Sequence, residues 1–331
     1  MSLLLSILLY FTGISYIGFL GVLSLLVPFL ILINLGFLIY WILKRHRNFL
    51  PVAAVLLLAY FVFGSFVKLQ KKGVLSEKDI KVLTFNARAF NNNEIIKRPN
   101  IDKKIISFVN GLNPDIICFQ EFYHIKQYDD NFSNYPYRFV DFNEENPRGK
   151  IIQAIFSKHP ILDKRVFDFK DSGNSAIAVT VSTENDTISV YNIHLESFGI
   201  IPDKETLSQD NSGRILKKMT KTFVKQQEQS NLLRKDIDQN IHKKILCGDF
   251  NNTQFSSIYR NIRGNLQDSF LECGNGFGKT IDLRGLPMRI DYIMADADFE
   301  FTSHTNYDVK LSDHYPVMAT LKLKTDQATV D

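Results

Sequence analysis

The sequence predicts an α/β domain that follows an apolar, helical amino-terminal segment. No charged side chain occurs over Met1–Leu43. From Ile80 onward, short runs rich in Val, Ile and Phe alternate with longer amphipathic stretches, and polar side chains recur where the apolar runs end. Such runs are typical of buried strands, and amphipathic stretches are typical of helices that cover a sheet. We therefore expect a membrane anchor at 1–67, a linker at 68–79 and an α/β domain at 80–325.

The amino-terminal segment has the composition of a multi-pass membrane anchor. A single straight helix over Met1–Leu43 would be about 65 Å long, roughly twice the thickness of a hydrocarbon core. We therefore predict two membrane-spanning helices there, near Leu3–Ile17 and Leu23–Leu43, and a third over Phe49–Val67. The alternatives are a buried core helix and a cleaved signal peptide, which normally has a basic start and a shorter apolar run.

Charge is unevenly distributed along the chain. Six of the 39 Lys and Arg residues precede Gly73, and none of the 35 Asp and Glu residues does, so the remainder has 33 basic and 35 acidic side chains and a net charge of −2. This near-neutral remainder shows no global sign of a nucleic-acid-binding surface. The basic turn Lys44–Arg47 favours the cytoplasm, which with three spans predicts an extracytoplasmic carboxy-terminal domain. Lys68, Lys71 and Lys72 favour the opposite orientation.

Composition excludes several classes of protein. The chain has only 17 Gly, 10 Pro and 3 Cys among 331 residues, which excludes a collagen-like chain and a disulfide scaffold. The cysteines have no regular spacing, so we expect ordinary thiols and neither a disulfide framework nor a zinc site. Cys118 and Cys247 lie in apolar runs that predict buried strands, and Cys273 is expected in a loop.

Eight apolar runs in the second part of the chain predict strands. They are Lys81–Phe85, Ile116–Phe119, Ile151–Phe156, Ala176–Val181, Ile188–Ile193, Ile245–Cys247, Ile290–Met294 and Val317–Leu323. Two amphipathic stretches, Ile95–Leu112 and Ile215–Ile241, predict helices, and Pro114 follows the end of the first. The longest predicted loop, Gly199–Gly213, could border a site.

Polar side chains gather at the ends of these strands. They are Asn86 with Arg88, Glu121, His194, Asp249 with Asn251, Asp291, and Asp313 with His314. Ligand crevices of α/β proteins form at such strand ends. Each residue alone has a structural explanation, such as a turn cap or a solvated rim charge, so the prediction depends on their combination. The remaining histidines are expected at the surface; they are His46, His124, His159, His242 and His304.

This set of side chains suits hydrolysis of a phosphate ester. Oxygen ligands such as Glu121, Asn86 and Asp313 match Mg²⁺ or Mn²⁺ better than Zn²⁺. Such an ion neutralises phosphate charge, and an Asp–His pair can supply a general base. The sequence has neither a glycine-rich phosphate loop nor a Gly-x-Ser-x-Gly motif, which disfavours nucleoside-triphosphate binding and serine hydrolysis.

Three further residues could contact the phosphate itself. The amide of Asn251, two residues after Asp249, can donate to a non-bridging oxygen. Arg88 and His194 could contact the same phosphate as cations or hydrogen-bond donors. We therefore expect Asn251 and Arg88 to bind substrate.

Six motifs occur in an order that resembles the endonuclease/exonuclease/phosphatase superfamily. They are TFNAR (Thr84–Arg88), DIICFQE (Asp115–Glu121), NIHLE (Asn192–Glu196), GDFN (Gly248–Asn251), RIDYIM (Arg289–Met294) and SDHYPV (Ser312–Val317). The resemblance covers about Ile80–Leu323 and points to the deoxyribonuclease and neutral sphingomyelinase branches. It implies a four-layer α/β sandwich, in which two packed mixed β-sheets are flanked by helices, with catalysis at one end of the sheets.

The resemblance also implies a metal site and a base. Glu121 binds a divalent metal, with Asn86 and Asp313 close to it; we expect one Mg²⁺ and allow a second. His314 is the general base, or the imidazole that stabilises the pentacovalent transition state, and Asp291 orients it.

The same resemblance implies how the water and the phosphate are held. Asp249 positions or activates the attacking water, and Asn251 holds the scissile phosphate. His194 stands where the deoxyribonuclease and sphingomyelinase branches have a second histidine. Because abasic-site endonucleases have a tyrosine at this position, His194 argues against that branch.

The predicted function is that of a membrane-anchored, metal-dependent phosphodiesterase, and its substrate stays open. A lipid phosphodiester would suit an anchored enzyme, and Phe198–Pro202 is a candidate membrane-contacting loop. DNA or RNA is the main alternative. A phosphomonoester would need added positive charge, for which Arg214, Lys217 and Lys218 are candidates. An inactive membrane adaptor is the last alternative; no protein partner is inferred.

Overall fold

The chain divides into two compact units. The structure is a computed structural model that describes residues 1–12, 18–65, 67–69, 79–123, 131–142, 151–183, 186–199, 209–283 and 286–324. The smaller unit comprises Met1–Phe66, Glu196–Asp236 and Asn252–Gly264. The larger unit comprises Val67–Leu195, Ile237–Asn251 and Asn265–Asp331.

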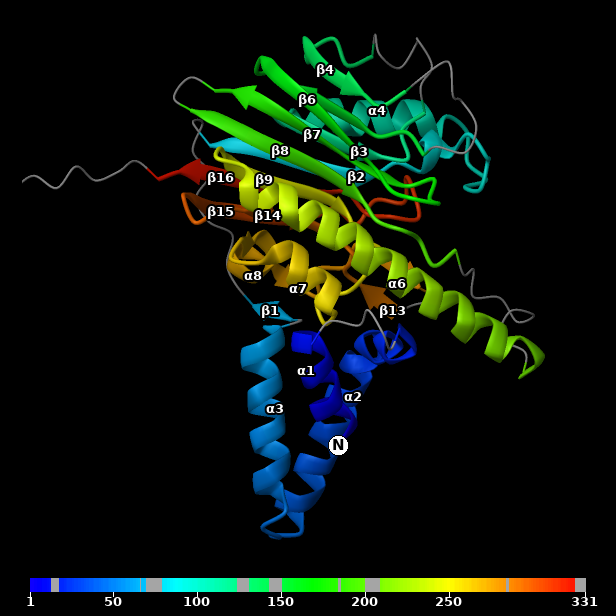
Figure 1. Cartoon of the computed structure of the whole chain (residues 1–331), viewed down its shortest axis with the longest axis vertical. Helices are drawn as coiled ribbons and strands as arrows, with labels where there is room; N and C mark the ends of the chain where they lie inside the picture. Colours follow the sequence, from blue (N-terminus) through cyan, green and yellow to red (C-terminus); the bar gives the residue numbers. More distant parts are fainter. Residues whose placement is uncertain are drawn as a thin grey trace, which may run out of the picture. The chain divides into compact units, whose positions relative to one another are not determined.

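Two six-stranded sheets form the larger unit (Figure 1). In spatial order, the first sheet contains β15 (Phe299–Asn306), β16 (Val317–Leu323), β2 (Ile80–Asn86), β3 (Ile116–Gln120), β5 (Ala154–Ser157) and β4 (Tyr137–Val140). The second contains β10 (Gln267–Asp268), β14 (Asp291–Ala295), β9 (Lys243–Asp249), β8 (Thr187–His194), β7 (Ser175–Ser182) and β6 (Ile161–Asp168). Each is mixed, because β2 pairs with β3 and β8 with β9 in parallel and the other pairs are antiparallel.

Shorter elements complete the larger unit. They are β1 (Lys68–Leu69) paired with β11 (Asn275–Gly276), β12 (Ile281–Leu283) paired with β13 (Leu286–Met288), the 3₁₀ turn η2 (Arg88–Asn91), α4 (Ile101–Leu112) and α8 (Ser269–Cys273). Two mixed sheets flanked by helices confirm the predicted α/β sandwich.

The main core lies between the two sheets. Val82 and Cys118 of the first sheet share one apolar cluster with Val190, Cys247 and Ile293 of the second, and all five are fully buried. The outer face of β2 and β3 is covered by α4, because its apolar stripe packs against these strands. The strands that the sequence predicts are those whose residues are apolar on both faces. They are apolar on both faces because both faces are buried.

Several predicted boundaries were wrong. Helix α4 begins at Ile101 and not at Ile95, since Glu94 and Asn100 adopt left-handed backbone conformations that interrupt a helix. Strand β5 begins at Ala154, three residues later than expected. Cys273 ends α8 instead of lying in a loop. Strands β4, β6 and β15 were not predicted, because their burial is partial.

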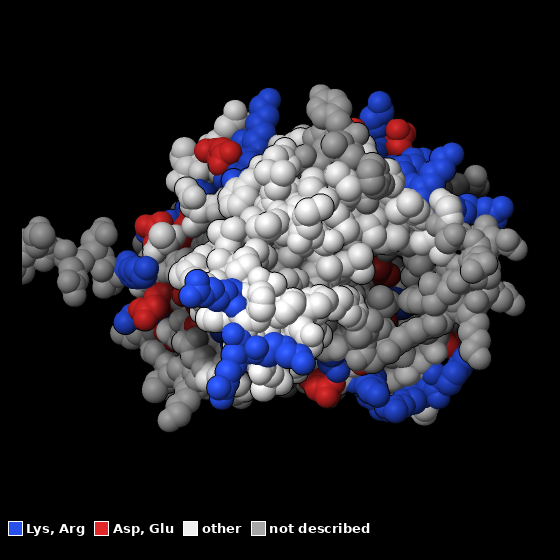
Figure 2. All heavy atoms as spheres, turned by 90° about the horizontal axis from the view of Figure 1, so that it is seen from below, with Lys and Arg blue, Asp and Glu red and all other residues white. Residues whose placement is uncertain are grey.

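Helices dominate the smaller unit. They are α1 (Ser2–Thr12), η1 (Gly18–Gly21), α2 (Val22–Leu43), α3 (Phe49–Phe63), α6 (Gln209–Gln239) and α7 (Ser257–Arg263). An apolar cluster joins α1, α2 and α3 through Leu3, Val27 and Ala59. Many of their other apolar side chains are exposed, such as Phe37 and Phe61. In the view from below, much of the visible face belongs to residues other than Lys, Arg, Asp and Glu (Figure 2).

The prediction of three membrane-spanning helices was wrong. Within the described residues, α2 alone is long and apolar enough to cross a membrane, by length and composition. Helices α1 and α3 have 11 and 15 residues, about 16 and 22 Å, which is shorter than a hydrocarbon core of about 30 Å. Helix α3 ends at Phe63 because Gly64 adopts a φ of 73°, so the apolar run to Val67 is not one helix.

Candidate active site

Three strands of the second sheet bring polar side chains into one row. The register pairs His194, the last residue of β8, with Asp249, the last residue of β9. Asp249 is also paired with Asp291, the first residue of β14. Nε2 of His194 lies 3.6 Å from Oδ2 of Asp249. Because paired residues of neighbouring strands present adjacent side chains, the sheet itself assembles this row.

His314 joins the row from the segment before β16. Its Nδ1 lies 3.0 Å from Oδ2 of Asp291, and its Nε2 lies 3.7 Å from Oδ2 of Asp249. The backbone here is held by β12, because His314 bridges Ile281 and the next residue donates its N–H to the carbonyl of Thr280. The structure therefore brings together His314, Asp291, Asp249 and His194.

Asn86 connects this row with the first sheet. It ends β2, and its Nδ2 donates to Oε1 of Glu121 and to Oδ2 of Asp249, both at 3.1 Å. Glu121 follows β3, with a φ of 49° in the left-handed region. Its side chain therefore meets Asn86 at the ends of the two parallel strands.

Asn251 turns back onto the carboxylate that precedes it. Its N–H donates to Oδ1 of Asp249 at 2.8 Å, and its Nδ2 donates to the carbonyl of Leu195 at 3.0 Å. The φ of Asn251 is 47°, a conformation that asparagine adopts more readily than most residues. This turn keeps the Asn251 amide beside Asp249.

Asp313, the third predicted metal ligand, has a different partner from Glu121 and Asn86. Its carboxylate forms an ion pair with Arg88, and its side chain is 39% exposed. The Arg88 N–H donates to Oδ1 of Asn86 at 3.1 Å. Of the three predicted ligands, Glu121 and Asn86 are therefore in direct contact, and Asp313 contacts Arg88.

Electrostatics in this region reflect burial and crowded carboxylates. Burial raises the pKa of Asp249, the neighbouring Asp291 raises it further, and His314 and His194 oppose the rise. Burial alone would lower the pKa of His314, but Asp291, Asp249 and Glu121 together raise it to about 9. Excess negative charge in a buried place favours a bound cation.

The donor set fits a hard divalent cation. Glu121, beside Asn86, offers carboxylate oxygens of the kind that Mg²⁺ and Mn²⁺ prefer. In the described part of the chain, ligand atoms of Asp249, Asp291 and His314 also lie within 4.8 Å of one another. Within the described residues, Glu121 and this second group are therefore candidate places for a cation.

Sequence comparison agrees with this geometry. The sequence profile of the endonuclease/exonuclease/phosphatase family matches residues 83–314, more than half of the chain. The chain belongs to the endonuclease/exonuclease/phosphatase family. It is therefore an enzyme of a class that hydrolyses phosphate esters with a divalent metal ion. A second profile, of a domain family of unknown function, matches residues 1–66. No curated protein matches the chain by sequence.

Solved structures share the fold at low sequence identity. TDP2 from D. rerio with a single-strand DNA product is 12% identical, covers 74% of this chain and 100% of its own, and has a TM-score of 0.55. The human Nocturnin catalytic domain with bound sulfate is 17% identical, with coverages of 76% and 97% and a TM-score of 0.56. Mannosyl-6-phosphatase from Bacteroides thetaiotaomicron is 17% identical, with coverages of 74% and 100% and a TM-score of 0.56.

A buried amide network supports the site of this family member. Nε2 of Gln120 donates to Oδ1 of Asn192 at 2.6 Å and to Oγ1 of Thr84 at 3.0 Å. Asn192 in turn donates to the carbonyls of Phe119 and Ala154. The network links β3 with β8, one strand from each sheet. It lies within the motifs, but an amide inside an apolar run was not predicted to be functional.

The backbone of Asp291 is held by Thr280, a residue that was not predicted to belong to the site. Oγ1 of Thr280 accepts hydrogen bonds from the N–H groups of Ile290 and Asp291. Arg289 does not pair with Asp291, because its guanidinium forms a buried ion pair with Asp268 at 2.7 Å. Asp291 therefore keeps its carboxylate for His314.

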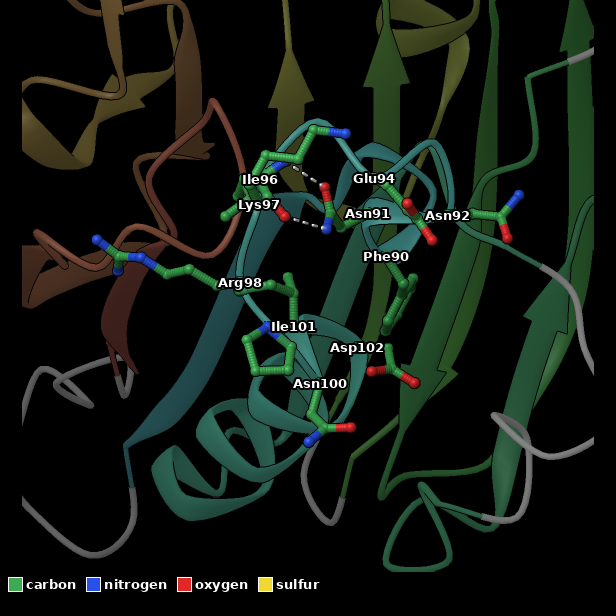
Figure 3. A pocket seen from close by; sticks show the side chains of 11 residues that line it. Phe90, Asn91, Asn92, Glu94, Ile96, Lys97, Arg98, Asn100, Ile101 and Asp102 are labelled. Carbon is green, nitrogen blue, oxygen red and sulfur yellow. Dashed lines mark hydrogen bonds between the residues drawn. The ribbon is translucent and has the colours of Figure 1, made fainter.

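A pocket of about 550 Å³ lies along the loop that follows Arg88, lined by residues 90–92, 94 and 96–102. The amide of Asn91 closes the loop, since it accepts from the N–H of Ile96 at 2.8 Å and donates to its carbonyl at 3.0 Å (Figure 3). Its charged lining residues are balanced, with Lys97 and Arg98 against Glu94 and Asp102. Residues 88–91 all have φ between 44° and 61°, a strained run of the kind that clusters at ligand sites.

Proposed function

We propose that this chain is a membrane-anchored, Mg²⁺-dependent phosphodiesterase in which water attacks the phosphorus. The observation that carries the proposal is the convergence on Oδ2 of Asp249. Nδ2 of Asn86 lies 3.1 Å from this oxygen, Nε2 of His194 3.6 Å and Nε2 of His314 3.7 Å. Donors from three separate segments around one buried carboxylate form a pre-organised polar site.

Each side chain has a part in the proposed reaction. Asp249 accepts a proton from water while the water oxygen bonds to phosphorus and the ester P–O bond breaks. Because Asp249 takes the proton of the water, His314, oriented by Asp291, donates a hydrogen bond to the pentacovalent phosphate, and Asn251 donates to a non-bridging oxygen. A divalent cation held at Glu121 would neutralise charge on the phosphate and the leaving oxygen. His194 and Arg88 hold the phosphate as donors.

Anchoring to a bilayer belongs to the same proposal. The support is α2, which is apolar over 22 residues and exposes large side chains such as Leu32 and Ile39. The proposed lipid-contacting loop has weaker support. The ring of Phe198 packs against Phe223 with centroids 5.1 Å apart, and residues 200–202 lie outside the described residues. Anchoring therefore depends on the helix and not on this loop.

A phosphomonoester is the second candidate substrate. The pocket after Arg88 supports it through its polar lining, because Lys97 and Arg98, together with Glu94 and Asp102, could hold a further polar group of a small substrate. One structural relative is described as a mannosyl-6-phosphatase. The residues predicted for this purpose, Arg214, Lys217 and Lys218, are exposed on α6.

The test is a side-by-side assay of the full chain in detergent with Mg²⁺. The substrates are sphingomyelin vesicles, bis-p-nitrophenyl phosphate, p-nitrophenyl phosphate, plasmid DNA and single-stranded RNA. We expect cleavage of the diesters in vesicles or solution, and loss of cleavage with EDTA and in His314→Ala. Cleavage of nucleic acid alone would replace the proposal by a nuclease, and cleavage of the monoester alone by a phosphatase. No cleavage of any substrate would favour the inactive adaptor.

A further inference from the structure

The segment that directly follows Asn251 is buried although it is polar. Residues 252–259 are all buried, and they include Asn252, Thr253, Gln254, Ser256 and Ser257. Buried polar groups are costly unless they are hydrogen-bonded. The partners of this segment therefore decide its conformation.

Several of these partners belong to the amino-terminal helices. Nε2 of Gln254 donates to the carbonyl of Phe63 at 3.0 Å. Phe63 is the last residue of α3, and its carbonyl is one of those that a helix leaves without an internal partner. Oγ1 of Thr253 lies 3.5 Å from the carbonyl of Ser24, near the start of α2.

Apolar and cationic contacts reinforce this attachment. The ring of Phe255 meets the ring of Phe63 edge to face, with centroids 5.4 Å apart, and both belong to the cluster that joins α1, α2 and α3. The guanidinium of Arg260 lies 4.8 Å from the ring centre of Phe11, and its Nη1 lies 3.5 Å from the Phe11 carbonyl. A cation is favourable there, because Phe11 lies at the carboxy-terminal end of α1.

The far side of the segment is held by α6. Nδ2 of Asn252 donates to Oε1 of Gln226 at 2.7 Å, and Oγ of Ser257 lies 3.4 Å from Oε1 of Gln227. Helices α2, α3 and α6 thus each provide a polar partner for this short segment. Without residues 1–66, the Gln254 amide would lose the Phe63 carbonyl and Phe255 would lose its apolar cover.

We propose that the amino-terminal helices are a positioning element for the phosphate-binding residue Asn251, and not only a tether. The argument rests on the proposed role of Asn251. Asn251 adopts a left-handed conformation, which asparagine enters more readily than most residues but which still carries strain, so its geometry depends on its neighbours. On one side it follows strand β9, and on the other its chain enters the segment 252–255, which the helices hold. Docking of the helices therefore restrains Asn251 through the backbone.

The test is a double-mutant cycle in the full chain, purified in detergent. Gln254→Ala removes the bond to α3, and Phe255→Leu loosens the ring contact while keeping an apolar side chain. Each is made alone and together with Asn251→Ala. The readouts are kcat on bis-p-nitrophenyl phosphate and the affinity for inorganic phosphate with Mg²⁺ by calorimetry, which requires no turnover. Lys235→Gln, an exposed change on α6, is the matched control.

We expect Gln254→Ala and Phe255→Leu each to lower kcat and phosphate affinity by about tenfold, since small misplacement of a positioning group is costly. In the Asn251→Ala background the same changes should have no further effect, because coupled residues are non-additive. Wild-type values in both variants, or an equal loss in both backgrounds, would overturn the proposal. Wild-type values in Asn251→Ala itself would instead remove Asn251 from the proposed site, and the positioning role with it.

Discussion

Nδ1 of His314 lies 3.0 Å from Oδ2 of Asp291, and both side chains are buried. This contact fixes the ring orientation and leaves Nε2 facing Asp249 at 3.7 Å. A carboxylate on one ring nitrogen keeps that nitrogen protonated and directs the other nitrogen away from it. The pair therefore determines which atom His314 can offer to a substrate.

We expect Asp291→Asn to lower kcat by about 100-fold, because the ring loses its charged partner while the side-chain volume is retained. The measurement is kcat on the diester that the wild-type chain cleaves, with circular dichroism to confirm folding. Thr280→Ser keeps the hydroxyl that supports the Asp291 backbone and serves as the control. A folded Asp291→Asn variant with wild-type kcat would refute the orienting role.

Removal of the cation should abolish activity, and loss of the Glu121 carboxylate should weaken Mg²⁺ binding. We expect EDTA to stop turnover and Glu121→Gln to raise the Mg²⁺ concentration for half-maximal activity by at least about tenfold, since even indirect partners of a metal contribute that much. Asp313→Asn is the informative comparison. If Asp313 acts by pairing with Arg88, its replacement should raise KM without changing the Mg²⁺ requirement. An unchanged requirement in Glu121→Gln would contradict the assignment.

Gly248 of the GDFN motif cannot accept a side chain. Its φ is 137°, and an added Cβ would lie 1.9 Å from the carbonyl oxygen of Ile193 on β8. We expect Gly248→Ala to lower the free energy of unfolding by about 3 kcal/mol or more, because the clash is with backbone. Chemical denaturation measures this, and Gly111→Ala, in open space on α4, should be neutral or stabilising. Equal stabilities would show that β8 and β9 can separate at little cost.

His304 should make the fold sensitive to acid. The pKa of His304 is lowered to about 4, mainly by burial and also by the nearby Arg289 cation. The Asp268 carboxylate and the hydrogen bond to Asn306 act in the opposite direction. In the unfolded chain His304 binds a proton below pH 6.5. In the folded chain it binds this proton only below about pH 4. The free energy of unfolding should therefore fall as pH falls through this window, by up to about 3 kcal/mol.

The check is chemical denaturation of wild type and His304→Gln between pH 7 and pH 4. The variant should lose part of this pH dependence, because glutamine does not titrate. His159→Gln, at a half-buried position, is the matched histidine substitution for comparison. If the free energy of unfolding of His304→Gln depends on pH as that of the wild type does, other groups cause the acid sensitivity. His304 was expected at the surface, and its burial shows that one histidine without a partner pattern does not reveal its environment.

Much of the larger unit could be predicted because its strands carry strong local signals. Strands such as β8 and β9 are apolar on both faces, and their polar ends stand out against that background. Partly exposed strands such as β6 and β15 lack this contrast, so composition alone did not separate them from loops. The start of α4 was misplaced because backbone strain at Asn100 has no mark in the hydropathy pattern.

The sequence by itself determined the α/β class, the family motifs and the residue types of the site, because these depend on composition and order. Only the tertiary structure decided that Asp249 lies between His194, His314 and Asn86, that Asp313 pairs with Arg88, and that Gln254 meets the end of α3. It also reduced three expected membrane spans to one candidate helix. The physical reason is that such contacts join residues far apart in the chain, and their partners are chosen by strand register and packing.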